Sequence, residues 1–412
     1  MPSGGPRAPW AGRRVVLGVT GGIAAYKVVQ VARDLTRAGA EVDVVMTRSA
    51  HEFVRPLSFE GVTGRPVYTD PFSADGAALH IRLGREADAV CVAPATADFL
   101  ARAADGRSDD LLTTTLLATR APVLLCPAMN DRMWIHPAVR ANAARCAELG
   151  YTLVGPDTGP LAVGEAEGPG RLVAPEEIVA RVGRSLGSNG PLAGRRVTIT
   201  AGPTREAVDP VRFLGNRSSG RMGFALAESA WLAGADVTLV TGPSALPDPI
   251  GVHTIRVESA REMLDAVRGP VGSAHLAIYA AAVSDFRPAD AADRKMKRRE
   301  METDVSVDLV ANPDIAAETR ALRPAGAVAV GFALETHDLL RYARAKLAEK
   351  GFDLLVANDA SDPEAGFEVA TNRVTLLEPE GDPVALPLAS KVEVADRIVA
   401  RAAELLALRE VT

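Results

Sequence analysis

The sequence predicts an α/β protein made of two Rossmann-like, doubly wound parallel-sheet domains in tandem. Two observations carry this prediction. The run Ala-Gly-Arg-Arg-Val at 11–15 recurs literally at 193–197, and each copy leads into a β-branched run and a glycine turn. Each turn is followed by a helical stretch and by a second strand-like run with a matching entry, at 39–42 and 234–237. Strand, glycine turn, helix and strand open a parallel βαβ unit, so the repeat predicts two such domains.

The length of the chain fits that division. A chain of 412 residues has room for two or three domains. The segment Ser-Leu-Gly-Ser-Asn-Gly-Pro at 185–191 lies between a helical stretch and the second copy of the repeat, and its composition is typical of a linker. We therefore expect a first domain over 1–190 and a second over 191–412.

The other elements are read from short β-branched runs for strands and from apolar spacing of about 3.6 residues for helices. The strands expected in the first domain are 15–20, 89–92, 123–126 and 153–154, and those in the second are 197–200, 276–280, 327–331 and 354–356. The clearest helices are 26–38, 138–149 and 338–350. In open sheets of this kind, ligands bind where the carboxyl ends of strands meet helix N-termini, so motifs at those places are the candidates for function.

The composition excludes several classes of protein. A net charge of −6 gives no general attraction to polyanions, and 4% aromatic residues are few for a single-strand or RNA binder. The three cysteines, Cys91, Cys126 and Cys146, form no Cys-X-X-Cys pattern, which fits a reducing compartment without a zinc site. No apolar run is long enough to span a membrane, so we expect a cytoplasmic protein.

The first glycine turn has the composition of a phosphate-binding loop. Thr20, Gly21, Gly22 and Ile23 follow the first strand and open a helix, where backbone N–H groups can approach a phosphate. The motif is not G-x-G-x-x-G, and the second strand ends at Thr47 without the acidic residue that holds an NAD ribose. A single phosphate, as in FMN, fits better; a tight turn with no ligand is the alternative.

Further polar segments stand at other strand ends. Ala93-Pro94-Ala95-Thr96 follows the third strand, and Pro-Ala-Met-Asn at 127–130 follows the fourth. Asp-Asp-Leu-Leu-Thr at 109–113 opens a helix, and His80 lies ahead of the third strand. Taken alone, a single histidine or a turn asparagine is more typical of structure than of catalysis.

Together, the segments 20–27, 93–96 and 127–134 and His80 resemble the flavin-dependent cysteine decarboxylases, specifically the phosphopantothenoylcysteine decarboxylase family. The resemblance implies a flavodoxin-like flavoprotein domain with bound FMN, His80 as the catalytic histidine and Asn130 as the anchor of the substrate carboxylate. Loss of CO2 needs an electron sink that no side chain supplies, and a flavin that oxidises the substrate thiol provides one. The FMN-binding positions that the resemblance implies are Thr20, Gly21, Gly22, Ile23, Thr47, Ala93, Pro94, Ala95, Thr96 and Thr113.

A glycine- and proline-rich segment at 155–172 departs from that family. We interpret the segment as a mobile lid, the alternative being a plain surface connection. In the family the lid reads Ala-Cys-Gly, and its cysteine donates the last proton; here it reads Ala162-Val163-Gly164. Because valine has no proton to donate, either another group or water supplies it, or the decarboxylase half is impaired.

The second domain carries two basic segments. Arg205, Arg212, Arg217 and Arg221 alternate with serine and glycine ahead of a helix, which suits an oxyanion-rich ligand at a helix N-terminus. A second basic loop, 281–299, follows the strand expected at 276–280. No G-x-x-x-x-G-K-[ST] motif occurs, which excludes a P-loop enzyme. Solvated arginine-rich loops are the alternative for both segments.

In order along 194–391, these segments resemble the phosphopantothenate–cysteine ligase family, the partner activity of the same bifunctional enzymes of coenzyme A biosynthesis. The resemblance implies a ligase domain, with Asn216 beside an acyl-cytidylate, Lys295 as a catalytic residue and Asp285 near Mg2+. The CTP-binding positions that it implies are Ala281, Asp285, Lys295, Asn312, Pro313, Asp314, Ile315, Phe332, Lys346 and Lys350. Lys346 and Lys350 stand four apart on one helix, where one ligand can meet both.

The two resemblances imply a fused enzyme that acts on phosphopantothenate, cysteine and CTP, with trimeric decarboxylase contacts and dimeric ligase contacts. Two alternatives stay open. One is a ligase joined to an impaired or repurposed flavoprotein half that acts on other thiols, and the other is a non-enzymatic flavin-binding regulator.

Overall fold

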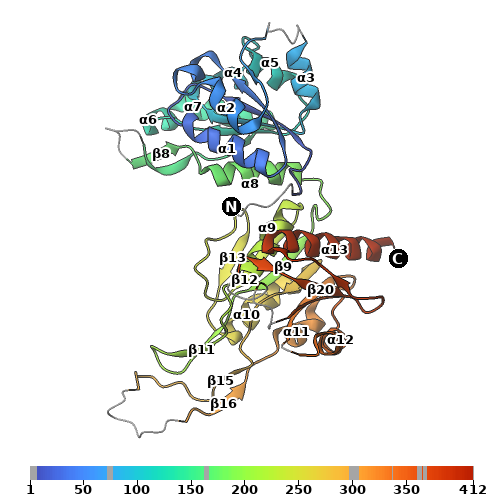
Figure 1. The fold of residues 1–412 in the computed structure, drawn as a ribbon. Helices are drawn as coiled ribbons and strands as arrows, with labels where there is room; N and C mark the ends of the chain where they lie inside the picture. The colour runs from blue at the N-terminus through green and yellow to red at the C-terminus, as the bar shows by residue number, and fades with distance from the viewer. Residues whose placement is uncertain are drawn as a thin grey trace. The chain divides into compact units, whose positions relative to one another are not determined.

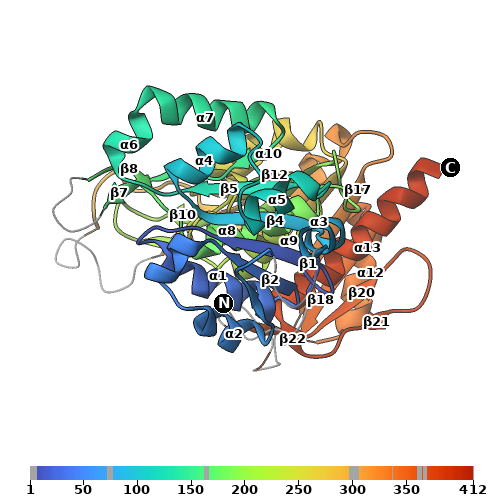
Figure 2. The ribbon, with the colours of Figure 1, turned by 90° about the horizontal axis from the view of Figure 1, so that it is seen from above.

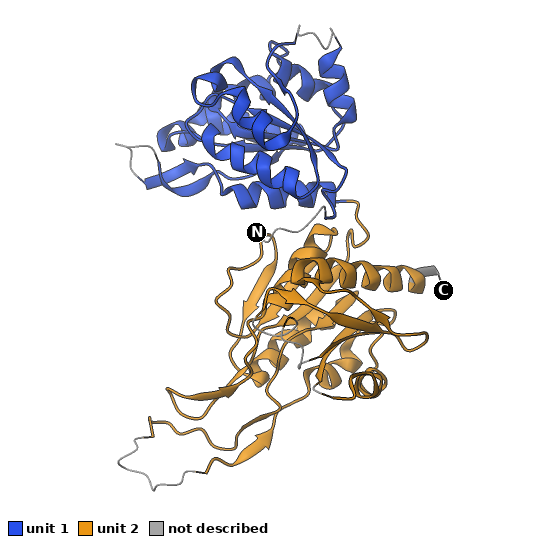
Figure 3. Cartoon of the chain, viewed as in Figure 1, with its two compact units in different colours: residues 1–188 blue, residues 189–412 orange. Residues whose placement is uncertain are grey.

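The computed structural model describes residues 7–71, 78–161, 167–296, 306–335, 337–359, 364 and 369–411. The chain divides into two compact units, Met1–Ser188 and Asn189–Thr412, which are coloured separately in Figure 3. The lid residues Ala162, Val163 and Gly164 lie outside the described residues.

Unit 1 is built on a six-stranded parallel sheet, and the doubly wound fold is confirmed (Figures 1 and 2). The strand order across the sheet is β3 (Val67–Tyr68), β2 (Glu41–Met46), β1 (Arg14–Val19), β4 (Ala89–Ala95), β5 (Val123–Pro127) and β6 (Thr152–Leu153). With β3 at the edge, this is the order of dinucleotide-binding folds, whereas in flavodoxin the second strand is the edge strand. Strand β4 is buried along its whole length and β1 at every residue after Arg14, as their near-continuous apolar sequences require.

Helices cover both faces of this sheet. One face carries α1 (Ala25–Arg37) and α8 (Pro175–Leu186), which pack against each other. The other face carries α3 (Leu79–Glu86), α4 (Ala97–Ala104), α5 (Leu111–Ala118) and α7 (Pro137–Glu148). Short elements complete the unit: η1 (Arg48–Glu52), α2 (Pro56–Thr63), α6 (Asp131–Ile135) and the hairpin β7 (Asp157–Pro160) with β8 (Glu167–Arg171).

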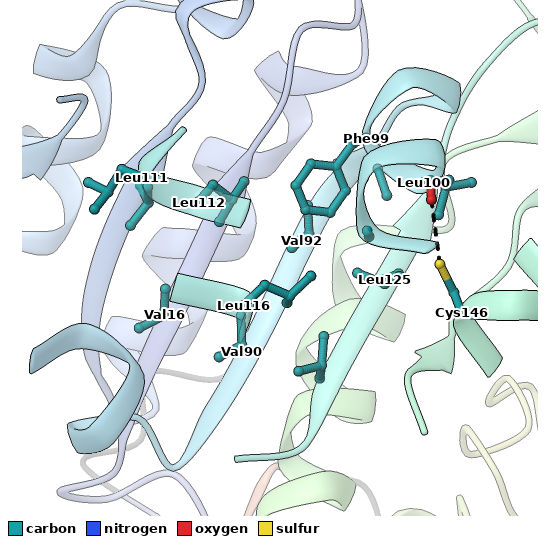
Figure 4. Close-up of a cluster of buried hydrophobic side chains, with 14 of the residues drawn as sticks. Val16, Val90, Val92, Phe99, Leu100, Leu111, Leu112, Leu116, Leu125 and Cys146 are labelled. Atoms are coloured by element: carbon teal, nitrogen blue, oxygen red, sulfur yellow. Dashed lines mark hydrogen bonds between the residues drawn. The ribbon is translucent and has the colours of Figure 1, made fainter. Parts of the chain in front are cut away.

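The main core of unit 1 lies under α4 and α5. Figure 4 shows Val90 and Val92 of β4 against Phe99, Leu112 and Leu116 of the two helices, all buried. At its edge the Cys146 thiol of α7 donates to the carbonyl oxygen of Leu100 at 3.6 Å (Figure 4).

The sequence repeat is also a structural repeat. Gly12 and Gly194 both adopt a φ of 70°, a left-handed conformation that favours glycine. After this turn, the backbone N–H of Glu41 donates to the carbonyl oxygen of Arg13. In the second unit the N–H of Asp236 donates to the carbonyl oxygen of Arg195, and both distances are 2.8 Å. The repeated residues therefore build the same entry into the first strand of each unit.

Unit 2 contains an eight-stranded sheet. Six parallel strands come in the order β13 (His253–Arg256), β12 (Asp236–Thr241), β9 (Arg196–Ala201), β14 (Leu276–Tyr279), β17 (Val328–Glu335) and β18 (Leu354–Asp359). Two antiparallel strands, β20 (Val374–Leu377) and β21 (Val384–Ala385), extend the sheet beyond β18 and were not predicted. The parallel, doubly wound part matches the expectation.

Two helix layers flank the sheet of unit 2. Helix α9 (Arg221–Leu232) and the long α13 (Lys391–Val411) pack side by side (Figures 1 and 2). Helices α10 (Ala260–Val271), α11 (Ile315–Glu318) and α12 (Leu339–Lys350) contribute to a separate core that includes Val267, Tyr279 and Phe352; η3 (Arg320–Leu322) follows α11.

Three two-stranded ribbons leave the main sheet of unit 2. They are β10 (Arg205–Ala207) with β11 (Phe213–Gly215), β15 (Phe286–Pro288) with β16 (Leu309–Ala311), and β19 (Thr371–Asn372) with β22 (Ala389–Ser390). The first two project away from the sheet in Figure 1. Within the described part of the chain, no helix is long and apolar enough to cross a membrane.

Candidate functional site

The carboxyl ends of β2, β1 and β4 meet at one place in unit 1. Thr20, which follows β1, is 1% exposed, and its hydroxyl donates to the carbonyl oxygen of Pro94 at 2.6 Å. The N–H of Thr96, after β4, donates back to Thr20 Oγ1 at 3.3 Å, and Thr96 Oγ1 caps α4. Thr47, after β2, donates its N–H to Val19 at 3.0 Å. The strand order reverses between β1 and β4, since β2 and β3 lie on one side of β1 and β4 to β6 on the other, and ligands bind at this reversal in doubly wound folds.

The glycine turn between β1 and α1 leaves no room for side chains on one side. A Cβ on Gly21 would lie 2.5 Å from Cβ of Ser49, so only glycine lets the turn approach η1. A Cβ on Gly22 would stand 3.6 Å from Thr96 and 3.7 Å from Pro94, which places this glycine beside the β4 loop. Ile23, next in the turn, leaves 65% of its surface exposed. The turn thus presents backbone and an exposed apolar side chain at the strand ends.

The other predicted FMN residues divide in two groups. Ala93, Pro94 and Ala95 form the buried end of β4, beside the same turn. Thr113 is 1% exposed and belongs to the capping box of α5, where its hydroxyl donates to Asp110 Oδ1 at 2.8 Å. Its hydroxyl is therefore held by its own helix N-terminus.

Asn130 meets the β7–β8 hairpin after β5. This hairpin, the lid hairpin, belongs to the segment interpreted as a lid. Asn130 Oδ1 caps α6 by accepting the N–H of Arg132 at 2.9 Å, and its Nδ2 has no partner among the described residues. The N–H of Met129 donates to the carbonyl oxygen of Gly170 in β8 at 2.9 Å. A Cβ on Gly170 would lie 2.3 Å from the Met129 oxygen, so glycine is required for this approach. The root of the lid is thereby fixed to the Pro-Ala-Met-Asn segment.

The structure does not bring His80 to Asn130 within one copy of unit 1. His80 is the second residue of α3, which packs against α5, whereas α6 packs against α7 and β8. Helices α3 and α6 lie on opposite sides of the unit in both views (Figures 1 and 2).

The three cysteines lie in the core of unit 1. Cys91 and Cys126 are fully buried with their sulfur atoms 3.9 Å apart, and the contact with Cys91, together with burial, raises the pKa of Cys126. Burial raises the pKa of Cys146 to about 11. Cys91 lies in β4, Cys126 in β5 and Cys146 in α7, so none of the three thiols belongs to the segment 155–172.

A cavity of about 280 Å³ opens between the loops after β14 and β16 and helix α12 in unit 2. All the predicted CTP-binding residues except Lys295 line it. Thr200, Tyr279, Val283, Ser284, Ala316 and Phe352 also line it and were not predicted. The predicted CTP-binding residues other than Lys295 therefore converge on one concave site.

An ion pair organises one wall of this cavity. Asp314 Oδ1 accepts the N–H of Ala317 at 2.9 Å, which caps α11, and Asp314 Oδ2 lies 2.6 Å from Lys350 Nζ. The hydrogen bond with Asp314 raises the pKa of Lys350. Burial opposes ionisation of Asp314, but the hydrogen bonds from Lys350 and from the N–H of Ala317, together with the charges of Lys350 and Lys346, outweigh it, so the pKa of Asp314 is lowered. Burial lowers the pKa of Lys346, one helical turn away.

A second cavity, of about 320 Å³, shares Ala281, Val283, Phe332 and Lys346 with the first. Its floor is the N-terminal end of α9, where Gly220 adopts a φ of 81° and no side chain caps the helix. A Cβ on Gly223 would lie 2.4 Å from Cβ of Ala201, so α9 packs closely on β9. Because they share the lining residues named above, the two cavities are neighbours on the carboxyl side of the sheet.

Asn216 ties two loops together at the rim of the second cavity. Its Nδ2 donates to the carbonyl oxygens of Ala282 and Val283, each at 3.1 Å. The carboxamide therefore fixes the loop before α9 to the loop after β14.

Sequence reasoning missed Asn372 and Lys391 in the second cavity, and it gave no role to Asn358, which lies in a segment that resembles the ligase family. All three residues line this cavity, and Asn372 and Lys391 are only 2% and 6% exposed. A signal was present at Lys391, a lysine at the start of an amphipathic helix, but a solvated position is the usual interpretation of such a residue.

Several predicted basic residues lie elsewhere. Of the four arginines expected around an oxyanion, only Arg221 lines the cavity. The Arg205 guanidinium stacks 4.5 Å above the Phe213 ring, and Arg212 Nε donates to Asp209 Oδ2 at 2.9 Å. Lys295 is exposed and lines neither cavity. Local partners within the β10–β11 ribbon account for Arg205 and Arg212.

The Arg212–Asp209 pair also fixes the chain beside Lys295. The guanidinium lowers the pKa of Asp209, whose Oδ2 accepts the N–H of Met296 at 3.2 Å. Arg212 Nη2 donates to the Met296 carbonyl oxygen at 2.8 Å. In the described ranges, no cluster of three or more His, Cys, Asp or Glu side chains is arranged to hold a metal ion.

Comparison with known proteins covers both units. The family described as Flavoprotein matches residues 7–187, and the family described as DNA/pantothenate metabolism flavoprotein C-terminal domain matches residues 192–406. The coenzyme A biosynthesis bifunctional protein CoaBC of Vibrio vulnificus is 46% identical over 94% of this chain and 97% of its own. The CoaBC of Mycobacterium tuberculosis is 47% identical over 94% of this chain and 95% of its own.

A solved structure is similar to unit 2. The crystal structure of the C-terminal domain of CoaBC is 39% identical, covers 53% of this chain and 98% of that one, and has a TM-score of 0.44. Two family matches in tandem and near-full-length relatives at this identity lead to one conclusion. The chain belongs to the CoaBC family of bifunctional proteins of coenzyme A biosynthesis.

Proposed function

We propose that unit 2 joins phosphopantothenate to cysteine at the expense of CTP and that unit 1 decarboxylates the product with FMN to give 4′-phosphopantetheine. The convergence of Asp285, Asn312–Ile315, Phe332, Lys346 and Lys350 on one cavity supports the first activity. Family membership supports the pairing of the two activities in one chain.

In the ligase reaction, a carboxylate oxygen, which is a poor leaving group, becomes part of CMP, which is a good one. A carboxylate oxygen of phosphopantothenate bonds to the α-phosphorus of CTP, and pyrophosphate leaves. The cysteine amine then bonds to the acyl carbon, CMP leaves, and the amine nitrogen loses a proton. Lys346 and Lys350 hold the phosphates as compact charges at the wall of the first cavity. Asn216 keeps the loop at the second cavity in place beside the acyl group.

Asp285 is the residue proposed to hold Mg2+. It lines the nucleotide cavity and is exposed there, and it is not part of a cluster of acidic side chains among the described residues. Mg2+ is commonly held by one or two carboxylates together with substrate phosphates. The ion would therefore enter with CTP, its remaining ligands being phosphate oxygens and water.

Lys295 remains a proposed catalytic residue of the ligase step. The Asp209–Arg212 pair holds the neighbouring Met296 on the projecting ribbons, away from the cavity lining. Lys295 would reach the acyl phosphate through movement of these ribbons or from a second copy of the chain.

The strand ends of unit 1 fit FMN. The glycine turn offers backbone N–H groups for one phosphate, and Gly21 is a position where a side chain would clash with η1. Bound FMN supplies the two-electron acceptor that oxidation of the substrate thiol requires. Thr20, Thr47 and Thr96 line these strand ends, and Ile23 offers apolar contact.

Asn130 and His80 are proposed to act on the thiol substrate. Asn130 Nδ2 has no hydrogen-bond partner among the described residues. It is therefore suited to donate to the substrate carboxylate. Because α3 and α6 lie on opposite sides of one unit, we infer that the decarboxylase site forms between copies of the chain, with His80 from one and Asn130 from another. The cytoplasm is the compartment that we propose, since the three cysteines are free thiols.

The ligase proposal is tested by pyrophosphate release with phosphopantothenate, CTP, Mg2+ and cysteine. We expect release that depends on CTP and rises when cysteine is added. Pyrophosphate release that does not depend on phosphopantothenate, or the absence of any release, contradicts the proposal. The impaired-decarboxylase alternative, raised by Val163, predicts pyrophosphate release with no CO2.

A further inference from the structure

The far end of the second cavity in unit 2 is lined by Asn358, Asn372 and Lys391, to which the sequence analysis gave no role. Lys391 is the first residue of α13, and its backbone N–H donates to the carbonyl oxygen of Ala370 at 3.0 Å. The β19–β22 pairing sets Asn372 opposite Ala389, so Asn372 and Lys391 enter the cavity wall from two neighbouring strand ends. Helix α13 packs along α9, whose N-terminal end forms the floor (Figure 1).

Two asparagines form a hydrogen-bonded pair at this end. Asn358 Nδ2 donates to Asn372 Oδ1 at 2.8 Å, and Asn372 Oδ1 also accepts the N–H of Arg373 at 3.1 Å. Asn358 Oδ1 is buried and has no hydrogen-bond partner in the described part of the chain, although it belongs to a residue that lines the cavity. A buried acceptor without a donor is costly in the ligand-free protein, and a ligand N–H or O–H removes that cost.

The same end carries concentrated positive charge. Lys391 is 6% exposed, and Arg221 lines the cavity in the first turn of α9. Burial and the nearby Arg221 lower the pKa of Lys391 to about 8. The backbone N–H groups of the uncapped α9 N-terminus add to the positive potential. This end of the cavity holds two side-chain cations and a helix N-terminus. A ligand with more than one negative charge would match it.

We propose that Lys391 is a substrate-binding residue of the ligase site, whose ammonium group, with Arg221, holds a phosphoryl group at the N-terminus of α9. The inference rests on the proposed function, because the reaction supplies the ligand. Two substrates offer this chemistry: the phosphate ester of phosphopantothenate and the triphosphate of CTP. A carboxylate carries only one charge, so the cysteine carboxylate is the weaker match.

The test uses the full-length protein and three variants. Lys391→Met keeps the length and apolar stem of the side chain but removes the charge, and Lys391→Arg keeps the charge. Arg397→Met is the matched control, since it removes an exposed cation from the same helix at a position outside both cavities. Pyrophosphate release is measured with each substrate varied in turn.

For Lys391→Met we expect the KM of one phosphoryl substrate to rise roughly 10- to 100-fold, as loss of a charge-assisted hydrogen bond predicts. The kcat should change far less, and Lys391→Arg should recover part of the loss. Arg397→Met should match the wild type.

Substrate analogues separate the two sources. If Lys391 holds the ester phosphate, its removal no longer matters when pantothenate, which lacks that phosphate, replaces phosphopantothenate. If Lys391 holds the triphosphate, the KM for CTP rises and the defect persists with pantothenate. A rise confined to the KM of cysteine, abolished when cysteamine replaces cysteine, overturns the phosphoryl assignment, as do unchanged KM values for both phosphoryl substrates.

Thermal unfolding distinguishes binding from a structural role. If Lys391 acts in binding, the Tm of ligand-free Lys391→Met should stay close to that of Lys391→Arg and of the wild type. A lowered Tm with proportional loss of kcat would assign Lys391 to folding and overturn the proposal. If the wild type itself releases no pyrophosphate, the proposed function fails instead, and direct calorimetric titration of CTP and of phosphopantothenate still compares the variants.

Discussion

Asp314 contributes to the nucleotide cavity in two ways: one oxygen caps α11 and the other pairs with Lys350. The pair is partly exposed, at 45% for Asp314 and 17% for Lys350, so it adds little to stability. Its effect is to hold the Lys350 ammonium at the cavity wall. Lys350 also contacts the exposed Glu349 at 2.9 Å, and Glu349 does not line the cavity.

Replacing Asp314 with Asn should therefore raise the KM for CTP about tenfold, because Lys350 loses the partner that orients it. Glu349→Gln removes the other carboxylate from the same lysine and should leave the KM unchanged. Pyrophosphate release at varied CTP checks both. If both variants raised the KM for CTP equally, the position of Lys350 at the cavity wall would not be what sets the affinity for CTP.

Lys391 also predicts a pH dependence of stability. Its pKa is lowered to about 8 from the usual 10.5, so between these values the unfolded chain binds more protons than the folded one. The free energy of unfolding contributed by this group therefore rises with pH through that window and is flat below it. Against Lys391→Met, the wild type should gain relative stability between about pH 7.5 and pH 10, measured by urea unfolding. A difference that does not change with pH would contradict the lowered pKa.

At the scale of elements, the lid hairpin and the Pro-Ala-Met-Asn segment act as one piece. The Met129–Gly170 hydrogen bond joins them, and Gly170 has a φ of 140° with no space for a Cβ. The lid root therefore sets the position of Asn130 at the start of α6. This coupling depends on backbone approach and is independent of which residue stands at position 163.

Gly170→Ala should lower the rate of CO2 release from phosphopantothenoylcysteine by about tenfold or more, because a shift near 1 Å at the substrate anchor is enough to do so. Pyrophosphate release by unit 2 of the same protein serves as the internal control. Gly61→Ala, in α2, where a Cβ meets nothing within 4 Å, is the matched substitution. An unchanged rate of CO2 release would show that the hairpin at Gly170 does not determine the position of the Asn130 segment.

Sequence patterns were sufficient for the central strands and the main helices. The buried runs at β1, β4 and β14 are apolar because both faces are covered, and this makes them readable. Strands β20 and β21 at the sheet edge were missed. The two-residue β21 is exposed and gives no periodic signal, whereas β20 is apolar and mostly buried but only four residues long.

The site residues also differ in whether local sequence is enough to place them. Those in contiguous motifs, such as 312–315, were placed in the cavity together because they share one loop. Lys391 and Asn372 reach the site through the long-range β19–β22 pairing, and local sequence does not encode that pairing. Arg205 and Arg212 were overestimated because their local partners, Phe213 and Asp209, were not foreseen.

At the scale of the whole molecule, the decarboxylase site proposed for unit 1 needs more than one copy of the chain. His80→Gln and Asn130→Ala should each abolish CO2 release when expressed alone. Co-expression of the two variants should restore a measurable fraction, since some interfaces then combine an intact His80 with an intact Asn130. Absence of any recovery in a confirmed mixed oligomer would place the two residues in one copy's own site.

The fused chain is proposed to run two reactions in order, and one measurement tests this directly. The protein is supplied with FMN, Mg2+, CTP, phosphopantothenate and cysteine labelled at its carboxyl carbon, and pyrophosphate and labelled CO2 are followed together. We predict that both are released, that CO2 requires CTP, and that 4′-phosphopantetheine accumulates. Pyrophosphate release without labelled CO2, or CO2 release without CTP, would contradict the account.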